Sequence, residues 1–160
     1  MRLLIAVATK KGFTLKCANA LADELRKRLD SDSRVDVVNL AEVDGVNLDG
    51  YDGVVVGGPV YAGSILKGVK EFCAQNRDAL MARPLGLFTC GLGKDDGARE
   101  QLEKVYPAEL LSHAVARESL GGALIYEEMF FLMRIFLRKL TKIEKSYSRV
   151  EEDAVQSVAD

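Results

Sequence analysis

Short, uninterrupted apolar runs alternate with helical segments along this chain. The first run, Leu3–Val7, is followed by a segment at 14–29 in which leucine and alanine recur at helical spacing opposite a charged face. Further apolar runs lie at 35–40, 54–56, 85–89 and within 113–124. Strands that are apolar throughout are typical of parallel sheets buried on both faces, and parallel strands need crossover helices. The pattern therefore predicts an α/β fold, a parallel sheet with helices on both faces.

The size and charge of the chain narrow the class of protein further. Its 160 residues predict one domain covering 1–160. The net charge of −2 is too balanced to indicate a nucleic-acid partner. The charge is uneven, because residues 128–149 hold six basic and two acidic side chains, which gives this segment +4 and the rest of the chain −6.

Cysteine and histidine offer little for metal or disulfide chemistry. The three cysteines, Cys17, Cys73 and Cys90, are odd in number and lack metal-type spacing, so free thiols are expected. The single histidine, His113, cannot form a metal site or a triad by itself and is expected to be structural. The sequence has no signal-peptide pattern and no uncharged run of about 18 residues, which predicts a cytoplasmic protein.

Ligands of open parallel sheets bind outside the carboxyl ends of the strands, where the strand order reverses. Three loops of this chain follow predicted strands: Ala8–Thr14, Gly57–Gly63 and Thr89–Lys94. We expect these three loops to form the binding site.

The first loop, residues 9–14 (TKKGFT), has the features of an anion site. The N-terminus of the following helix leaves N–H groups unpaired and carries partial positive charge. Gly12 lets the backbone approach an oxygen closely, and Thr9 and Thr14 supply hydroxyl donors. Alternatively, Thr14 is the N-cap of the helix and the loop is a simple capped turn.

Three other patterns are excluded for this loop. It lacks the Gly-Lys-Ser/Thr of a Walker motif, and it has one glycine where a dinucleotide fingerprint has three. A receiver-type response regulator needs acidic residues at its strand ends, whereas the first strand here ends at Ala8 and the third at Gly57. These exclusions leave an α/β domain whose first loop is either a different kind of phosphate loop or a simple capped turn.

Two motifs resemble those of the flavodoxin family. The pattern Thr9-x-x-Gly12-x-Thr14 after an apolar strand resembles the flavodoxin phosphate loop, and residues 51–63 (YDGVVVGGPVYAG) resemble the second flavin loop. The similarity covers residues 2–124. It implies a flavodoxin-like three-layer sandwich, a five-stranded parallel sheet in the order 2-1-3-4-5, and FMN as the cofactor.

The resemblance also implies which residues contact FMN. Lys11 stands where the family has a hydroxyl residue, which adds positive charge for the phosphate dianion. Tyr61 is the expected stacking partner of the flavin ring, and Gly57, Gly58 and Gly63 would let the main chain approach its polar edge. The expected cofactor-binding residues are Thr9, Lys10, Lys11, Gly12, Phe13, Thr14, Pro59, Val60, Tyr61, Ala62, Gly63, Thr89, Cys90, Gly91, Leu92 and Gly93.

The third loop, Cys90–Lys94, contains no aromatic residue. One face of the flavin is then open to a substrate, which favours an enzyme over an electron carrier. Cys90 is interpreted as a packing residue, since the sequence places no partner cysteine nearby. The titratable candidates Tyr61, Cys90 and Lys94 include no convincing general acid or base, so no catalytic residue is assigned.

The segment 129–147 predicts an amphipathic helix near the C-terminus. Phe131 and Ile135 fall within its basic face, where exposure to water is unfavourable. A basic face with large apolar residues is typical of membrane-surface helices, the alternative being a packing helix with a solvated face. The basic residues of this face are Arg134, Arg138, Lys142, Lys145 and Arg149.

This segment, placed at 128–149 before a last helix at 150–158, resembles the insertion of menaquinone-dependent protoporphyrinogen IX dehydrogenases. The resemblance implies a peripheral membrane FMN enzyme that oxidises a small-molecule redox substrate, protoporphyrinogen, and passes the electrons to a quinone. Two alternatives stay open: a flavodoxin-type electron carrier without its own substrate, and a flavin-free regulatory domain. Assembly as a homodimer is open as well.

Overall fold

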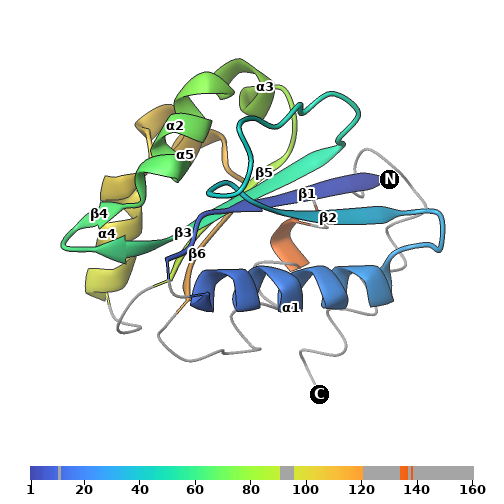
Figure 1. The fold of residues 1–160 in the computed structure, drawn as a ribbon, viewed down its shortest axis with the longest axis horizontal. Coiled ribbons are helices and arrows are strands. Elements are labelled where there is room, and N and C mark those ends of the chain that lie inside the picture. The colour runs from blue at the N-terminus through green and yellow to red at the C-terminus, as the bar shows by residue number, and fades with distance from the viewer. Residues whose placement is uncertain (11, 91–95, 121–133, 137, 139–160) are drawn as a thin grey trace.

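The computed structural model of this chain describes residues 1–10, 12–90, 96–120, 134–136 and 138 (Figure 1). Strands and helices alternate, as the sequence pattern predicts. In chain order the elements are β1 (Arg2–Val7), α1 (Phe13–Arg28), β2 (Arg34–Asn39), β3 (Gly53–Tyr61), β4 (Ser64–Ile65), α2 (Lys67–Gln75), α3 (Arg77–Met81), β5 (Leu85–Cys90), α4 (Asp96–Val105), α5 (Ala108–His113) and β6 (Ala116–Leu120).

Five of the strands form a parallel sheet in the order β2-β1-β3-β5-β6. Counted without the two-residue β4, this is the predicted order 2-1-3-4-5, so the flavodoxin-like fold is confirmed. β4 pairs antiparallel with the end of β3 and was not expected from the sequence. The order reverses at β1, which places the carboxyl ends of β1 and β3 side by side.

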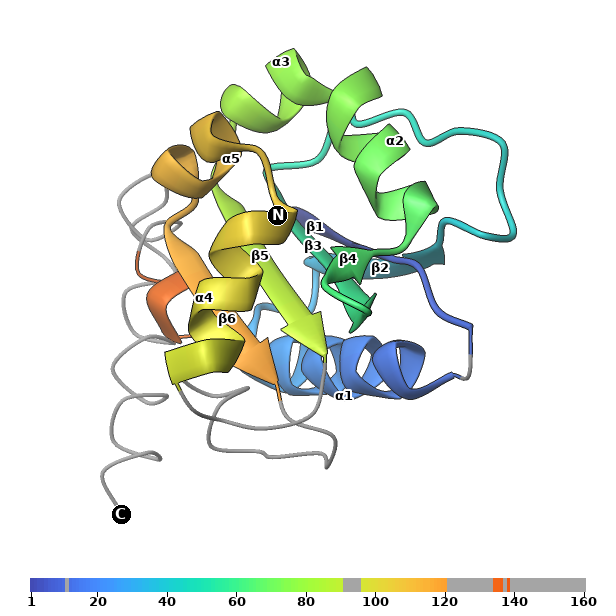
Figure 2. The same ribbon diagram turned by 90° about the vertical axis from the view of Figure 1, so that its left-hand side faces the viewer.

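Helices cover both faces of the sheet, so the molecule has three layers (Figures 1 and 2). Alternate residues of β1 point to opposite faces. Leu3 and Ile5 pack in the cluster that includes Leu21 of α1, whereas Leu4 packs in the cluster that includes Phe72 of α2. Both clusters consist of buried residues, which explains why the strands are apolar throughout.

β3 is longer than predicted, because Gly57 and Gly58 lie inside the strand and do not end it. Both pair in register with β5, and a Cβ on Gly57 would lie 2.1 Å from the Phe88 ring. A Cβ on Gly58 would lie 2.8 Å from Val69. The two glycines are therefore required by close packing inside the strand, whereas contact of their main chain with the flavin stays a prediction.

Residues 134–136 and 138 are helical, in agreement with the predicted C-terminal helix. Phe136 is buried in the cluster beneath α1, and Ile135 is half-buried against the same cluster. The sequence placed Ile135 on the basic face as an apolar residue unsuited to water, and in the structure this cluster partly covers it. The remainder of the predicted segment 128–149 and the helix 150–158 lie outside the described residues.

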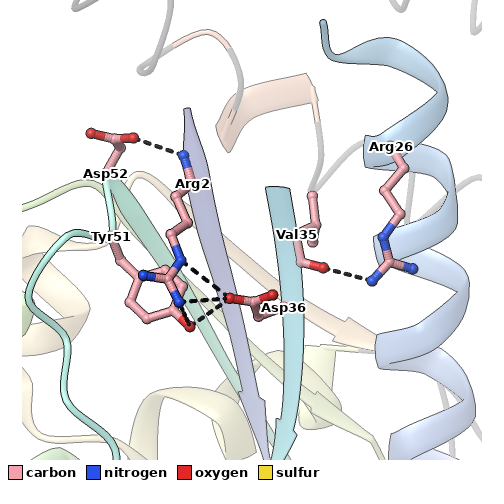
Figure 3. A network of polar contacts seen from close by, with 6 residues as sticks. All are labelled: Arg2, Arg26, Val35, Asp36, Tyr51 and Asp52. Carbon is pink, nitrogen blue, oxygen red and sulfur yellow. Dashed lines mark hydrogen bonds and ion pairs between the residues drawn. The ribbon is translucent and has the colours of Figure 1, made fainter. Parts of the chain in front are cut away.

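A polar network joins the amino end of β1 to β2 and to the segment before β3 (Figure 3). The Arg2 guanidinium lies 3.2 Å from Asp36 Oδ2 and 4.3 Å from the centre of the Tyr51 ring. The Tyr51 hydroxyl donates to the same carboxylate oxygen at 2.7 Å, and Asp52 accepts from the Arg2 backbone N–H at 2.8 Å. The hydrogen bond from Tyr51, aided by Arg2, holds the pKa of Asp36 below its ordinary value.

Replacing Asp36 with asparagine should cost less than about 1 kcal/mol of unfolding free energy at pH 7, because the carboxylate is partly exposed. The folded-state pKa is depressed, so this contribution is present above about pH 4 and is lost as the pH falls through the folded value. Urea denaturation at pH 7 and pH 3 measures it. The exposed Asp32→Asn is the matched control, and an equal cost of Asp36→Asn at both pH values would contradict the prediction.

Candidate functional site

The first loop leads from the end of β1 directly into α1. The Thr9 hydroxyl accepts from the Gly12 N–H at 2.9 Å, and Gly12 adopts a left-handed φ of 84° as the residue before the helix. No side chain caps α1, and its first turn holds no acidic residue. The N–H groups of this turn are therefore open to an anion, as the sequence predicts.

No described atom fills the space next to Gly12 in this loop. A Cβ built on Gly12 meets nothing within 4 Å among the described atoms, so the glycine faces an open cradle. Lys10 is exposed beside it, whereas Phe13 is half-buried and packs against the core. Lys11 lies outside the described residues. The donor set of backbone N–H groups, a hydroxyl and an ammonium suits a phosphate.

Thr14 is the second residue of α1, so the alternative that it caps the helix is wrong. Thr14 is 1% exposed, and its side chain lies beside the Cys90 thiol at the end of β5. Thr14 thus ties the start of α1 to the third loop.

The second loop is a tight hairpin between β3 and β4. Tyr61 pairs with Ser64, and the two residues between them both have positive φ, 50° at Ala62 and 77° at Gly63. This is the pattern of a type I′ turn, which glycine adopts freely and alanine only at a cost. Two other residues of this loop are expected to bind the cofactor: Pro59 is buried in β3, and Val60 is half-buried.

The hairpin presents Tyr61 beside the first loop. Tyr61 is 40% exposed, and the Lys10 ammonium lies 5.5 Å from the centre of the Tyr61 ring. This cation–π contact joins the first loop to the hairpin that carries Tyr61. An exposed tyrosine ring at this edge can stack on a planar ligand.

The third loop begins at Thr89 and Cys90, the last residues of β5, and both are buried. Thr89 Oγ1 lies 3.4 Å from Ser119 Oγ of β6. Cys90 pairs in register with Pro59, so the carboxyl ends of β3 and β5 meet at one edge of the sheet (Figure 2). The predicted residues Gly91, Leu92 and Gly93 lie outside the described residues.

Cys90 has a neighbouring cysteine, contrary to the sequence interpretation. Cys17 of α1 contacts it, and both thiols are buried. Contact with Cys17, together with burial, raises the pKa of Cys90, so this thiol is protonated and unreactive at neutral pH. The contact of Cys17 with Cys90 was not predicted. Cys17 lies one helical turn after Thr14 on the buried face of α1, and this position could have indicated the contact.

Other titratable groups in the described part of the chain supply no metal site. No cluster of three or more histidine, cysteine or acidic side chains occurs there. His113 ends α5 and its Nε2–H donates to the Arg83 carbonyl at 2.8 Å, which fits the predicted structural role. No described helix is long and apolar enough to cross a membrane.

An open helix N-terminus next to an exposed aromatic hairpin, at the switch point of a parallel sheet, defines a mononucleotide-binding α/β domain. The family model for the flavodoxin domain matches residues 4–151, and the chain belongs to this family. FMN is the cofactor of this domain. No curated protein matches the sequence.

Solved structures share the fold at low sequence identity. Oxidised flavodoxin 1 from Bacillus cereus is 15% identical with a TM-score of 0.56, and the match covers 86% of this chain and 98% of that one. A WrbA-like flavodoxin from Agrobacterium tumefaciens is 15% identical with a TM-score of 0.55 and coverages of 97% and 98%.

A larger protein also contains this fold. The rubredoxin oxygen oxidoreductase of Desulfovibrio gigas is 15% identical with a TM-score of 0.59, and the match covers 96% of this chain. The present chain spans only 37% of the length of that protein.

Proposed function

We propose that this protein is an FMN-dependent oxidoreductase that oxidises a small reduced substrate of the protoporphyrinogen type and passes the electrons to a quinone. The observation that supports an enzyme is that the two loops expected to flank the flavin ring, 57–63 and 90–94, contain one aromatic residue in the sequence, Tyr61. Tyr61 is exposed on the hairpin, whereas the sequence from Cys90 to Lys94 contains no aromatic side chain that could cover the other face of the flavin. A substrate then has direct access to the ring.

The chain's own residues supply binding and position. The open N–H groups at the start of α1 and the Lys10 ammonium hold the phosphate, and the Thr9–Gly12 hydrogen bond keeps the loop in its anion-binding shape. The Tyr61 ring would pack against one face of the flavin and exclude water from it. When bound, FMN supplies the redox chemistry itself.

Turnover measurements test the enzyme. The FMN-loaded protein is mixed anaerobically with protoporphyrinogen and then with a menaquinone analogue, and the flavin absorbance is followed by stopped flow. We expect rapid reduction and rapid reoxidation, both much faster than with free FMN as the control. Reduction no faster than that of free FMN would overturn the proposal.

An electron carrier is the second candidate function. The length of the fold match favours it, because the match to a flavodoxin covers 98% of that protein's chain. A carrier would exchange electrons rapidly with a protein redox partner and would turn over no quinone. The same stopped-flow comparison therefore separates the two functions.

Membrane contact through residues 129–149 is a further part of the proposal. Arg138 is exposed on this segment, while Ile135 and Phe136 pack on the core, so the attraction would come from the basic residues. Each basic residue contributes about 1 kcal/mol of binding free energy near an anionic bilayer. Replacing Arg138, Lys142 and Lys145 together with glutamine should weaken binding to phosphatidylglycerol vesicles by roughly 100-fold.

The matched control replaces three exposed cations elsewhere on the chain, Lys27, Arg34 and Lys67, with glutamine. Vesicle binding that falls equally in both triple variants, or in neither, would contradict membrane contact through this segment. FMN occupancy should be the same in both variants.

A further inference from the structure

A cavity of about 310 Å³ lies on the sheet face opposite α1. One wall comes from β4 and α2 and the other from the end of α4 and the turn before α5. Its buried lining residues belong to the cluster on the α2 side, whereas Thr14, Cys17 and Cys90 contact one another on the α1 side. The cavity therefore lies on the opposite face of the sheet from the Thr14–Cys90 contact, and it adjoins the second loop, because its lining residue Ile65 pairs with Val60.

The floor of this cavity is apolar. Ile65, Val69 and Cys73 are all buried, and burial raises the pKa of the Cys73 thiol to about 12, so it carries no charge. Tyr106 contributes its ring, because its hydroxyl already donates to the Phe88 carbonyl at 2.6 Å. A ligand body that packs here must be apolar.

The rim of the cavity is cationic. Lys70 and Lys104 come from different helices, and no carboxylate belongs to the described lining. The Lys70 ammonium donates to the neutral Ser64 hydroxyl at 2.7 Å and forms no ion pair with a carboxylate in the described part of the chain. By contrast, Lys67 on the same helix pairs with Glu71 at 3.4 Å. Two ammonium groups beside an apolar floor are complementary to a carboxylate with an apolar body.

We propose that this cavity is a second ligand site that binds a small amphipathic carboxylate. The apolar part packs on Ile65, Val69 and Cys73, and the carboxylate accepts hydrogen bonds from Lys70 and Lys104. The volume is at the small end of the range for ligand pockets and fits a compound of roughly 10 to 15 non-hydrogen atoms. The proposal does not depend on FMN binding.

The test is an NMR titration of the ¹⁵N-labelled full chain, as purified and with FMN added, using naphthoate as the probe. We expect saturable amide shifts confined to residues 64–73 and 104–106. Naphthalenemethanol, the neutral counterpart, should bind at least tenfold more weakly. The double variant Lys70→Gln/Lys104→Gln should weaken naphthoate binding to a similar extent.

Lys67→Gln is the matched control, because this lysine is also exposed on α2 but pairs with Glu71. It should bind naphthoate as the wild type does. Absence of saturable shifts, shifts centred on residues 9–14 and Tyr61, or equal affinity of the double variant would each overturn the proposal.

Discussion

Replacing Gly57 with alanine is expected to lower the free energy of unfolding by about 3 kcal/mol. The new Cβ would lie 2.1 Å from Cζ of Phe88, a side chain that is fully buried. Neither group can move away easily, because Gly57 pairs with Val7 on one side and with Phe88 on the other. Urea denaturation followed by circular dichroism measures the loss.

Two further variants isolate the clash. Gly45→Ala adds the same methyl group in an exposed loop where nothing lies within 4 Å, and it should change stability by less than about 0.5 kcal/mol. In a Phe88→Leu background, Gly57→Ala should cost clearly less than it does in the wild type. An equal cost in both backgrounds would show that Phe88 is not what requires glycine at this position.

The second large effect is expected at Gly12. Gly12→Ala should weaken FMN binding by on the order of 10- to 100-fold, because the Cβ enters the open cradle in front of α1 and disturbs charge-assisted hydrogen bonds to the phosphate. The positive φ of 84° adds roughly 1 kcal/mol of strain to folding. Fluorescence titration of the apoprotein with FMN gives the affinity.

Gly50→Ala is the matched control for backbone strain. Gly50 has nearly the same φ, 85°, but lies in the loop before β3, where its Cβ would approach Arg2. The two variants should lose similar stability, while only Gly12→Ala loses FMN affinity. Equal FMN affinity of Gly12→Ala and wild type would remove this loop from the phosphate site.

The alternation of buried strands and helices could be predicted from the sequence because continuous apolar runs and helical spacing reflect burial directly, whereas the strand order followed from the resemblance to the flavodoxin family. The length of β3 could not be predicted from the sequence. Glycine is a strong turn signal, and the residues that require it at 57 and 58, Phe88 and Val69, come from elements far along the chain. Only the three-dimensional contact distinguishes a packing glycine from a loop glycine.

The same limit applies to the candidate site. The sequence identifies the first loop because a strand, a glycine and a helix start are local features. It does not reveal that Cys17 contacts Cys90 or that Lys10 lies over Tyr61, since each contact joins residues that are far apart in the sequence. Ile135 shows the same problem, because a helical pattern gives the face of a residue but not what covers that face.

The most direct test of the account is an equilibrium titration of the apoprotein with FMN, followed by flavin absorbance and fluorescence. We predict saturation at one FMN per chain, with the visible bands of oxidised flavin shifted from those of the free cofactor and the fluorescence quenched by Tyr61. A protein that stays colourless after purification and shows no saturable change on addition of FMN would contradict the central claim, that these loops form an FMN site.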